Sequence, residues 1–294
     1  GACGVSNITG FDNVGYHSGT TGQILSFVNT GNGTFCGQTV TTSNHSPVLT
    51  IPYQDGFYIP IATPFELTAS ATDEDGDDIL YTWQQYNLGP AIALGQQVST
   101  SPSFRVYDPS PNPTRVFPRL QTLISNGTNP HELLPTYTRN LKFRCLARDN
   151  NVVEQAGGLT WADVSFEATE TAGPFRVNFP DANVPAMKAG NEITVEWDVA
   201  NTDNSLVNCR AVNIKLSLDG GNTYPYTLAC TTPNDGNETV FLPDVNSNTA
   251  RIRVEAADNI FFDISNQNFI IENSDEPGFT FSICSQTQQV CVPN

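Results

Sequence analysis

The stretch Glu192-Ile-Thr-Val-Glu-Trp-Asp198 places an apolar side chain at every second position. This period of two is typical of a β-strand with one buried and one solvated face. Ala211-Val-Asn-Ile-Lys-Leu-Ser217 is a second run of this kind, and Asp219-Gly-Gly221 follows it as a tight hairpin turn. Short strands joined by tight turns predict an antiparallel β-sandwich in this part of the chain.

Further strand patterns surround these two runs. About seven such segments occur in roughly 100 residues, which is the number expected of an immunoglobulin-like or fibronectin-like domain. They are 175–179, 192–198, 211–217, 224–228, 238–242, 250–255 and 268–271. Gly173-Pro174 precedes the first of them and marks a boundary. We therefore predict a fibronectin-like sandwich over residues 173–273.

The chain before this boundary predicts a second sandwich, immunoglobulin-like or cadherin-like, over residues 46–172. Its strand patterns are 47–51, 65–71, 79–84, 140–147 and 162–168. Trp83 lies in one of them and is a predicted core residue. Residues 87–135 are rich in proline, and we expect an ordered excursion there, anchored by Phe104 and Phe117, because a structureless loop of that length is rare in a compact domain.

Two short pieces flank the sandwiches. Residues 1–45 form a leader in which 20–31 is the best helix candidate, with four apolar residues on one face (Ile24, Leu25, Phe27 and Val28). Residues 274–294 are expected to form a hairpin that docks on the second sandwich, opens a further module or pairs with another chain, since a lone hairpin is marginal in water. The predicted fold class is therefore all-β, with two tandem sandwiches, a helix-containing leader and a C-terminal hairpin.

The charge of the chain limits its partners. The 294 residues carry a formal charge of −17, from 30 acidic and 13 basic side chains. Such a field repels nucleic acid and anionic bilayers. The sequence has no apolar run of about 18 residues, so we predict no membrane insertion. The expected partner is a protein or a cell surface, with self-association through the termini as an alternative.

The cysteines and sequons favour a secreted, extracellular or cell-surface location. Three local disulfides are predicted, Cys3–Cys36, Cys209–Cys230 and Cys284–Cys291, which leaves Cys145 as a buried strand residue. Five N-x-S/T sequons are candidate glycosylation sites in exposed loops: Asn7, Asn32, Asn44, Asn126 and Asn237.

The densest acidic cluster, Asp73-Glu-Asp-Gly-Asp-Asp78, predicts a calcium site. Carboxylates at alternate positions, with a glycine for the bend, give the hard oxygen ligands that Ca²⁺ requires. The candidate ligands in this loop are Asp73, Asp75, Asp77 and Asp78, and Asp149 is added if its loop lies at the same end of the sandwich. The spacing is not that of an EF-hand, and the alternative is a solvated acidic turn.

The sequence offers no catalytic residues. It contains no G-x-S-x-G motif, and its three histidines (His17, His45 and His131) are far apart, so neither a hydrolase triad nor a zinc site is predicted. Six further aspartates are interpreted as turn formers: Asp198, Asp203, Asp219, Asp235, Asp258 and Asp263. The aromatic residues Phe57, Tyr58, Phe261 and Phe262 fit core packing better than a carbohydrate platform.

Several motifs resemble a known family. The runs 135–144, Arg148-Asp-Asn150 and Ala172-Gly-Pro-Phe175 are similar to the accessory region of secreted reprolysin-like zinc metallopeptidases of Bacteroidota-type bacteria. The segments Glu196-Trp-Asp-Val199 and 216–221 resemble the fibronectin-like module of that family. The leader resembles the end of its catalytic domain, but the H-E-x-x-H-x-x-G-x-x-H zinc motif is absent.

Three functional hypotheses follow. The first is a non-catalytic extracellular region of a metallopeptidase-like protein that acts as a spacer, binding or presentation module. The second is a structural subunit of an extracellular filament or surface layer, assembled by strand addition between chains. The third is a fragment of an active zinc metallopeptidase, whose catalytic residues lie outside this sequence.

Overall fold

The computed structural model describes residues 17–37, 40–154, 156–181 and 184–273. These residues form two compact units, and each unit draws on separate parts of the chain. The first comprises the chain up to Gly56 together with Leu67–Arg115 and Asn140–Phe166. The second comprises Phe57–Glu66, Val116–Arg139 and the chain from Glu167 onward.

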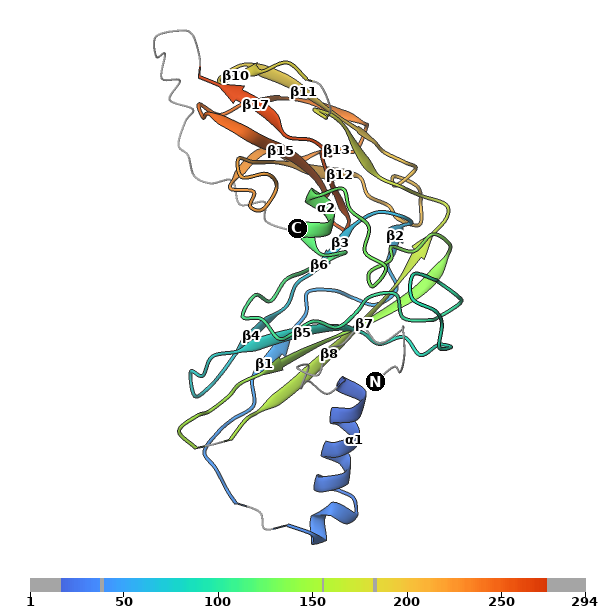
Figure 1. Ribbon diagram of the computed structural model, residues 1–294, viewed down its shortest axis with the longest axis vertical. Coiled ribbons are helices and arrows are strands. Elements are labelled where there is room, and N and C mark those ends of the chain that lie inside the picture. The colour runs from blue at the N-terminus through green and yellow to red at the C-terminus, as the bar shows by residue number, and fades with distance from the viewer. Residues whose placement is uncertain (1–16, 38–39, 155, 182–183, 274–294) are drawn as a thin grey trace. The chain divides into compact units, whose positions relative to one another are not determined.

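The prediction of an all-β fold with a short N-terminal helix is confirmed (Figure 1). The helices are α1 (Ser18–Asn29), the 3₁₀ turn η2 (Asn32–Phe35) and the short α2 (Leu120–Ile124). The strands up to the predicted boundary are β1 (Val48–Thr50), β2 (Tyr58–Pro60), β3 (Phe65–Leu67), β4 (Ser70–Thr72), β5 (Leu80–Gln85), β6 (Arg115–Phe117), β7 (Arg139–Arg148) and β8 (Leu159–Thr169). The predicted C-terminal hairpin lies outside the described residues.

The strands after the boundary form an immunoglobulin-like sandwich. They are β9 (Arg176–Phe179), β10 (Met187–Lys188), β11 (Glu192–Asp198), β12 (Ala211–Ser217), β13 (Tyr226–Pro233), β14 (Asn237–Phe241), β15 (Ser247–Ala256), β16 (Phe262–Ile264) and β17 (Phe269–Glu272). One sheet has the order β14-β11-β9, and the other has the order β10-β17-β15-β12-β13, with β16 added beside β15. Strands that follow one another in sequence are thus divided between two sheets, as in a Greek key.

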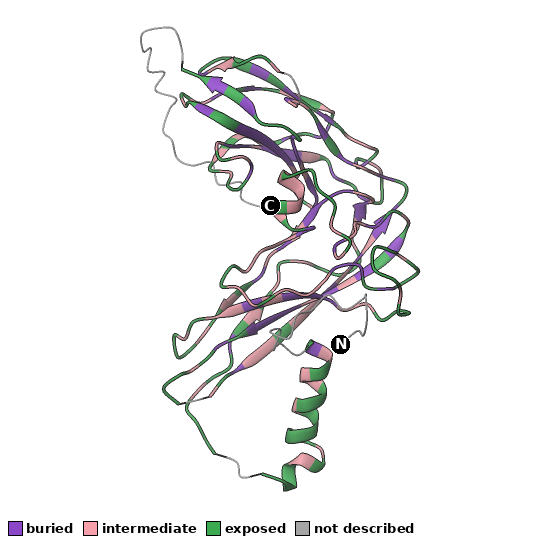
Figure 2. Ribbon diagram, viewed as in Figure 1, coloured by how far each residue is buried: buried purple, intermediate pink, exposed green. Residues whose placement is uncertain are grey.

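The core of the first unit lies along β5 and β7, which pair antiparallel with Trp83 opposite Cys145. Both residues are buried, as predicted, and the indole N–H of Trp83 donates to the Pro113 carbonyl at 2.9 Å. Phe104, in the proline-rich excursion, packs 5.9 Å from the Phe143 ring, measured between centroids. The excursion is therefore anchored to the sheet by an aromatic contact, as expected of an ordered segment. Buried residues lie mainly on the strands, and exposed ones mainly on the connecting loops and on α1 (Figure 2).

The segment Phe57–Glu66 belongs to the second unit, although it precedes most strands of the first in sequence. Phe65 forms a β-bridge with Phe261. The side chain of Asn259 donates to the Tyr58 carbonyl at 3.0 Å. Phe65 and Phe261 are both almost fully buried, so this segment supplies part of the hydrophobic core of the second unit.

The second unit also contains a group of ion pairs around the buried Arg253. Arg253 lies 2.8 Å from Glu66 through Nη2 and 2.8 Å from Glu255 through Nε. Lys215 Nζ approaches the other oxygen of Glu255 at 2.6 Å. The guanidinium stacks on Phe262, with 3.8 Å between Cζ and the ring centroid. Each carboxylate in this group therefore has a cationic side chain beside it.

Helix α1 forms close to the predicted range. His17 caps its first turn, because the ring Nδ1 accepts a hydrogen bond from the Gly19 N–H at 3.2 Å. Three apolar residues of its predicted face, Ile24, Phe27 and Val28, are exposed. No described helix is both long and apolar enough to span a bilayer.

Candidate calcium site

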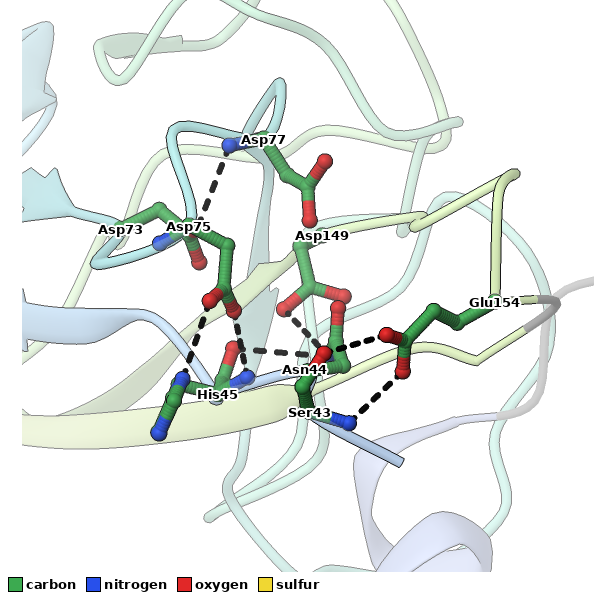
Figure 3. Close-up of polar contacts among 8 residues, drawn as sticks. All are labelled: Ser43, Asn44, His45, Asp73, Asp75, Asp77, Asp149 and Glu154. Atoms are coloured by element: carbon green, nitrogen blue, oxygen red, sulfur yellow. Dashed lines mark hydrogen bonds and ion pairs between the residues drawn. The ribbon is translucent and has the colours of Figure 1, made fainter. Parts of the chain in front are cut away.

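The acidic loop lies between β4 and β5 in the first unit, and its three alternate aspartates point toward one another (Figure 3). Asp73, Asp75 and Asp77 each place one carboxylate oxygen within 4.8 Å of the others. Asp73 Oδ1 also accepts the backbone N–H groups of Asp75 at 3.0 Å and of Asp77 at 3.1 Å. Gly76 has a φ of +77°, which is the left-handed bend that this turn needs.

The group gathers negative charge, and one basic side chain, His45, lies beside Asp75. Desolvation, followed by the charges of Asp73, Asp149 and Asp75, raises the pKa of Asp77. One oxygen of Asp73 and one of Asp77, Oδ2 in each case, is shielded from solvent and accepts no hydrogen bond. Shielded acceptors without a donor are costly to the folded protein, and a bound cation is one group that would satisfy them.

Asp149 approaches this loop from the end of β7 and is almost completely buried. Its Oδ1 accepts the N–H of Gly158, and its Oδ2 lies 3.4 Å from Asn44 Nδ2. A Cβ at position 158 would come within 2.5 Å of Asp149 Oδ2 and of Ser46 Cα. Glycine at this position therefore permits the close approach that positions the carboxylate.

The extended segment Ser43–His45 contacts both acidic loops. Ser43 donates its N–H to Glu154 Oε2 at 2.7 Å, and its hydroxyl bonds the other oxygen of Glu154. His45 donates its N–H to Asp75 Oδ2 at 2.6 Å, and its Nδ1 lies 3.0 Å from Asp75 Oδ1. These contacts raise the pKa of His45, and they lower the pKa values of Asp75 and Glu154.

The predicted ligands are thus partly assembled. The structure brings Asp73, Asp75 and Asp77 together, and Asp149 lies beside them, whereas Asp78 is exposed and outside the group. Within the described residues this is the single cluster of three or more metal-ligating side chains. The sequence did not predict that Ser43–His45 lie at this site, because they precede the loop by about 30 residues and Asn44 was interpreted only as a glycosylation sequon.

The donor set suits a hard divalent cation. All the converging atoms are oxygens, and neither thiolate nor free imidazole joins the described cluster. Ca²⁺ takes six to eight oxygen ligands at about 2.3–2.6 Å, so opposite ligands lie about 4.6–5.2 Å apart. The three aspartate oxygens lie within 4.8 Å of one another, which is close enough for one ion of this size to contact all three. The residues present therefore fit a calcium ion.

Two predicted disulfides are not formed. Cys36 and Cys209 are free thiols, so neither the Cys3–Cys36 nor the Cys209–Cys230 bond is present. The register pairs Ala211 with Pro233 and Ile214 with Ala229. Cys230 is consequently about four residues, or ~13 Å, beyond Cys209 along the ladder, whereas a disulfide needs Cα atoms within about 7 Å.

The remaining predicted modification sites have mixed outcomes. Cys145 is a buried free thiol in β7, as expected, and burial raises its pKa to about 12. Asn32, Asn126 and Asn237 are exposed, and Asn44 is half-buried. Asn7 and the Cys284–Cys291 pair lie outside the described residues.

Comparisons with known proteins add only distant similarity. No protein-family model matches the chain, and no curated protein matches it. A solved Dscam structure is 8% identical over 79% of this chain and 47% of that chain, with a TM-score of 0.24. Immunoglobulin domains 1–5 of Sidekick-1 are 11% identical over 78% of this chain and 40% of that chain, with a TM-score of 0.24.

The chain therefore spans less than half the length of either solved structure. TM-scores of 0.24 are too low to carry a functional property from those proteins to this chain.

Proposed function

We propose that this chain is a non-catalytic extracellular spacer and binding region, whose first sandwich is stabilised by Ca²⁺ held in the Asp73–Asp78 loop. The convergence of Asp73, Asp75 and Asp77, with shielded oxygens that accept no hydrogen bond, is the observation that carries this proposal. Bound Ca²⁺ supplies positive charge, and the chain's own carboxylates hold it in place.

The immunoglobulin-like architecture supports the spacer and binding role. Sandwiches of this kind present loops and sheet faces on a stable core, and such domains recur in proteins that bind other proteins. The motifs at 135–144, Arg148-Asp-Asn150 and Ala172-Gly-Pro-Phe175 support a place within a secreted metallopeptidase-like protein. In that context the module spaces or presents its neighbours and takes no part in peptide hydrolysis.

Calorimetric titration of chelator-treated protein with CaCl₂ tests the proposal. We expect one site with a Kd of about 0.1–1 mM, the range of extracellular calcium modules. The ion should also raise the Tm, because it binds the folded state alone. The double variant D73N/D77N should lose both effects. The amide oxygen that D73N introduces would still accept the two backbone N–H groups that shape the loop.

The matched control is E74Q. Glu74 lies in the same loop and is exposed, but it is outside the converging group, so its loss removes one charge and no ligand. E74Q should bind Ca²⁺ within about twofold of wild type, because charges in water are strongly screened. Absence of both a binding heat and a thermal shift in wild type would refute the calcium proposal.

A further inference from the structure

Helix α1 is attached to the first sandwich through its first turn. Within the helix, Ser18 alone is buried, and its backbone N–H donates to Oε1 of Gln84 in β5 at 2.9 Å. The His17 ring stacks on the Tyr86 ring just after β5, with 5.8 Å between the centroids and 5° between the planes. Phe27, farther along the helix, is exposed. The contacts of His17 and Ser18 with the end of β5 therefore hold the helix against the sandwich.

The imidazole of His17 makes these contacts in its neutral form. Its Nδ1 accepts the Gly19 N–H at 3.2 Å, and this bond caps the first turn of α1. The ring also forms a hydrogen bond with the backbone of Gln85, and that bond favours a proton on the ring. A histidine with one accepting and one donating nitrogen is neutral. A second proton would occupy Nδ1 and leave the Gly19 N–H without its acceptor.

The charges around His17 also favour the neutral ring. Lys142 Nζ and Arg144 Cζ, both from β7, lie 5.5 Å and 4.0 Å from the centroid of the Tyr86 ring on which the imidazole stacks. Asp163 of β8 binds both cations, at 3.0 Å from Lys142 and at 2.6 and 2.9 Å from Arg144. These neighbours comprise two cations and one carboxylate, and α1 itself carries no charged side chain. Desolvation lowers the pKa of His17, the backbone hydrogen bond opposes this shift, and the charge of Arg144 adds to it.

We propose that pH controls the docking of α1 on the first sandwich: the helix is bound while His17 is neutral and is released when the ring is protonated. Protonation removes the helix cap and places a third cation beside Lys142 and Arg144, so both changes weaken the same contact. Because docking lowers the pKa of His17 below its ordinary value of 6.5, the released helix binds the proton more readily. Docking is therefore strongest above about pH 6.5 and weakens as the pH falls below that value.

Hydrogen exchange of the peptide covering residues 18–30, measured in the full chain with a chelator present, tests this inference. A helix of 12 residues is marginal in water without tertiary contacts, so its release should reduce protection. After correction for the intrinsic pH dependence of exchange, protection should fall by about 2- to 30-fold from pH 7.5 to pH 5, the range for loss of a helix cap. Protection of β7 should persist, which separates helix release from unfolding of the sandwich. Unchanged protection of residues 18–30 at pH 5, or an equal loss in β7, would overturn the inference.

Two variants test whether His17 is the group that titrates. H17N keeps a side-chain acceptor for the Gly19 N–H, because asparagine is a strong helix cap, and H17F keeps an aromatic ring to stack on Tyr86. Neither new side chain titrates, so protection of residues 18–30 should be independent of pH in both variants, whatever its level at pH 7.5. H131Q, at a histidine of the other unit, is the control and should keep the wild-type pH dependence. A loss of protection at pH 5 as large as that of wild type in H17N and H17F would contradict the role of His17.

Discussion

Carboxylates converge in each of the two units, but the two groups are balanced differently. In the first unit, Asp73, Asp75 and Asp77 meet with an imidazole beside them, that of His45, 3.0 Å from Asp75. In the second unit, Glu66 and Glu255 meet around Arg253, with Lys215 beside them. The chain supplies arginine and lysine where the carboxylates serve the core, whereas in the loop the basic neighbour of Asp75 is a histidine, whose charge depends on pH.

This difference separates a structural cluster from a binding cluster. An internal cation balances the carboxylates without any ion from solution, because both charges lose their hydration together when the protein folds. An acidic group without a cation is stabilised only when an ion arrives from solution, so its energy depends on ion concentration. Three substitutions test this comparison, and the one with the largest expected effect comes first.

Removing the internal cation should have the largest effect. R253M removes the central partner of Glu66 and Glu255. We expect a loss of about 3 kcal/mol, the lower end of the range for breaking a buried pair, because both carboxylates are partly exposed and Lys215 remains beside Glu255. Urea unfolding of the full chain measures this loss in the free energy of unfolding. The control R210M, at an exposed arginine, should change it by less than about 0.5 kcal/mol. A loss below about 1 kcal/mol in R253M would show that the pairs contribute little.

A carboxylate in a desolvated environment, that of Asp263, should make stability depend on pH. Burial raises the pKa of Asp263 from 3.8 to about 7, although the carboxylate accepts the Val177 N–H at 2.8 Å. Between these values the folded state binds the extra proton, so stability falls as pH rises, by at most about 1.4 kcal/mol per pH unit.

D263N removes this titration. The free energy of unfolding of wild type should fall between pH 4.5 and pH 8, whereas that of D263N should not fall through this titration. The difference between the two proteins should therefore change by on the order of 2 kcal/mol in favour of D263N, as measured by urea unfolding at each pH. D235N, at an exposed aspartate, should follow wild type across the same range. Parallel pH profiles for D263N and wild type would contradict the assignment.

The smallest expected effect is a shift in Tm caused by D77N in the first unit, and its sign should depend on whether Ca²⁺ is present. Desolvation, followed by neighbouring negative charges, raises the pKa of Asp77, so neutralising it in D77N should raise the Tm when a chelator is present. With Ca²⁺ present, the same substitution removes a ligand and should lower the Tm relative to wild type. Thermal unfolding of D77N and wild type in both conditions measures this change of sign. A Tm shift of the same sign in both conditions would contradict calcium binding by Asp77.

Sequence patterns predict the strands well, because the period of two depends on local residues alone. Residues 192–198 and 211–217 coincide with β11 and β12, and the turn at Asp219-Gly-Gly221 joins antiparallel neighbours. The acidic loop was also predictable, since all its carboxylates lie within six consecutive positions.

What the sequence hides is the pairing of distant segments. Asn44 reads as a sequon, and its contact with Asp149 joins positions 105 residues apart. The segment Phe57–Glu66 reads as part of the first sandwich, yet its partners are Asn259 and Phe261. The Cys209–Cys230 pairing failed for the related reason that proximity in sequence does not give the strand register.

The position of Phe57–Glu66 has a consequence for how the protein is made. During synthesis this segment leaves the ribosome long before Asn259, whose side chain bonds Tyr58 from 201 residues away. Phe65 therefore cannot pair with Phe261 until nearly the whole described chain has been translated. The second unit can close only then, and a polypeptide begun at residue 173 would lack one wall of that core.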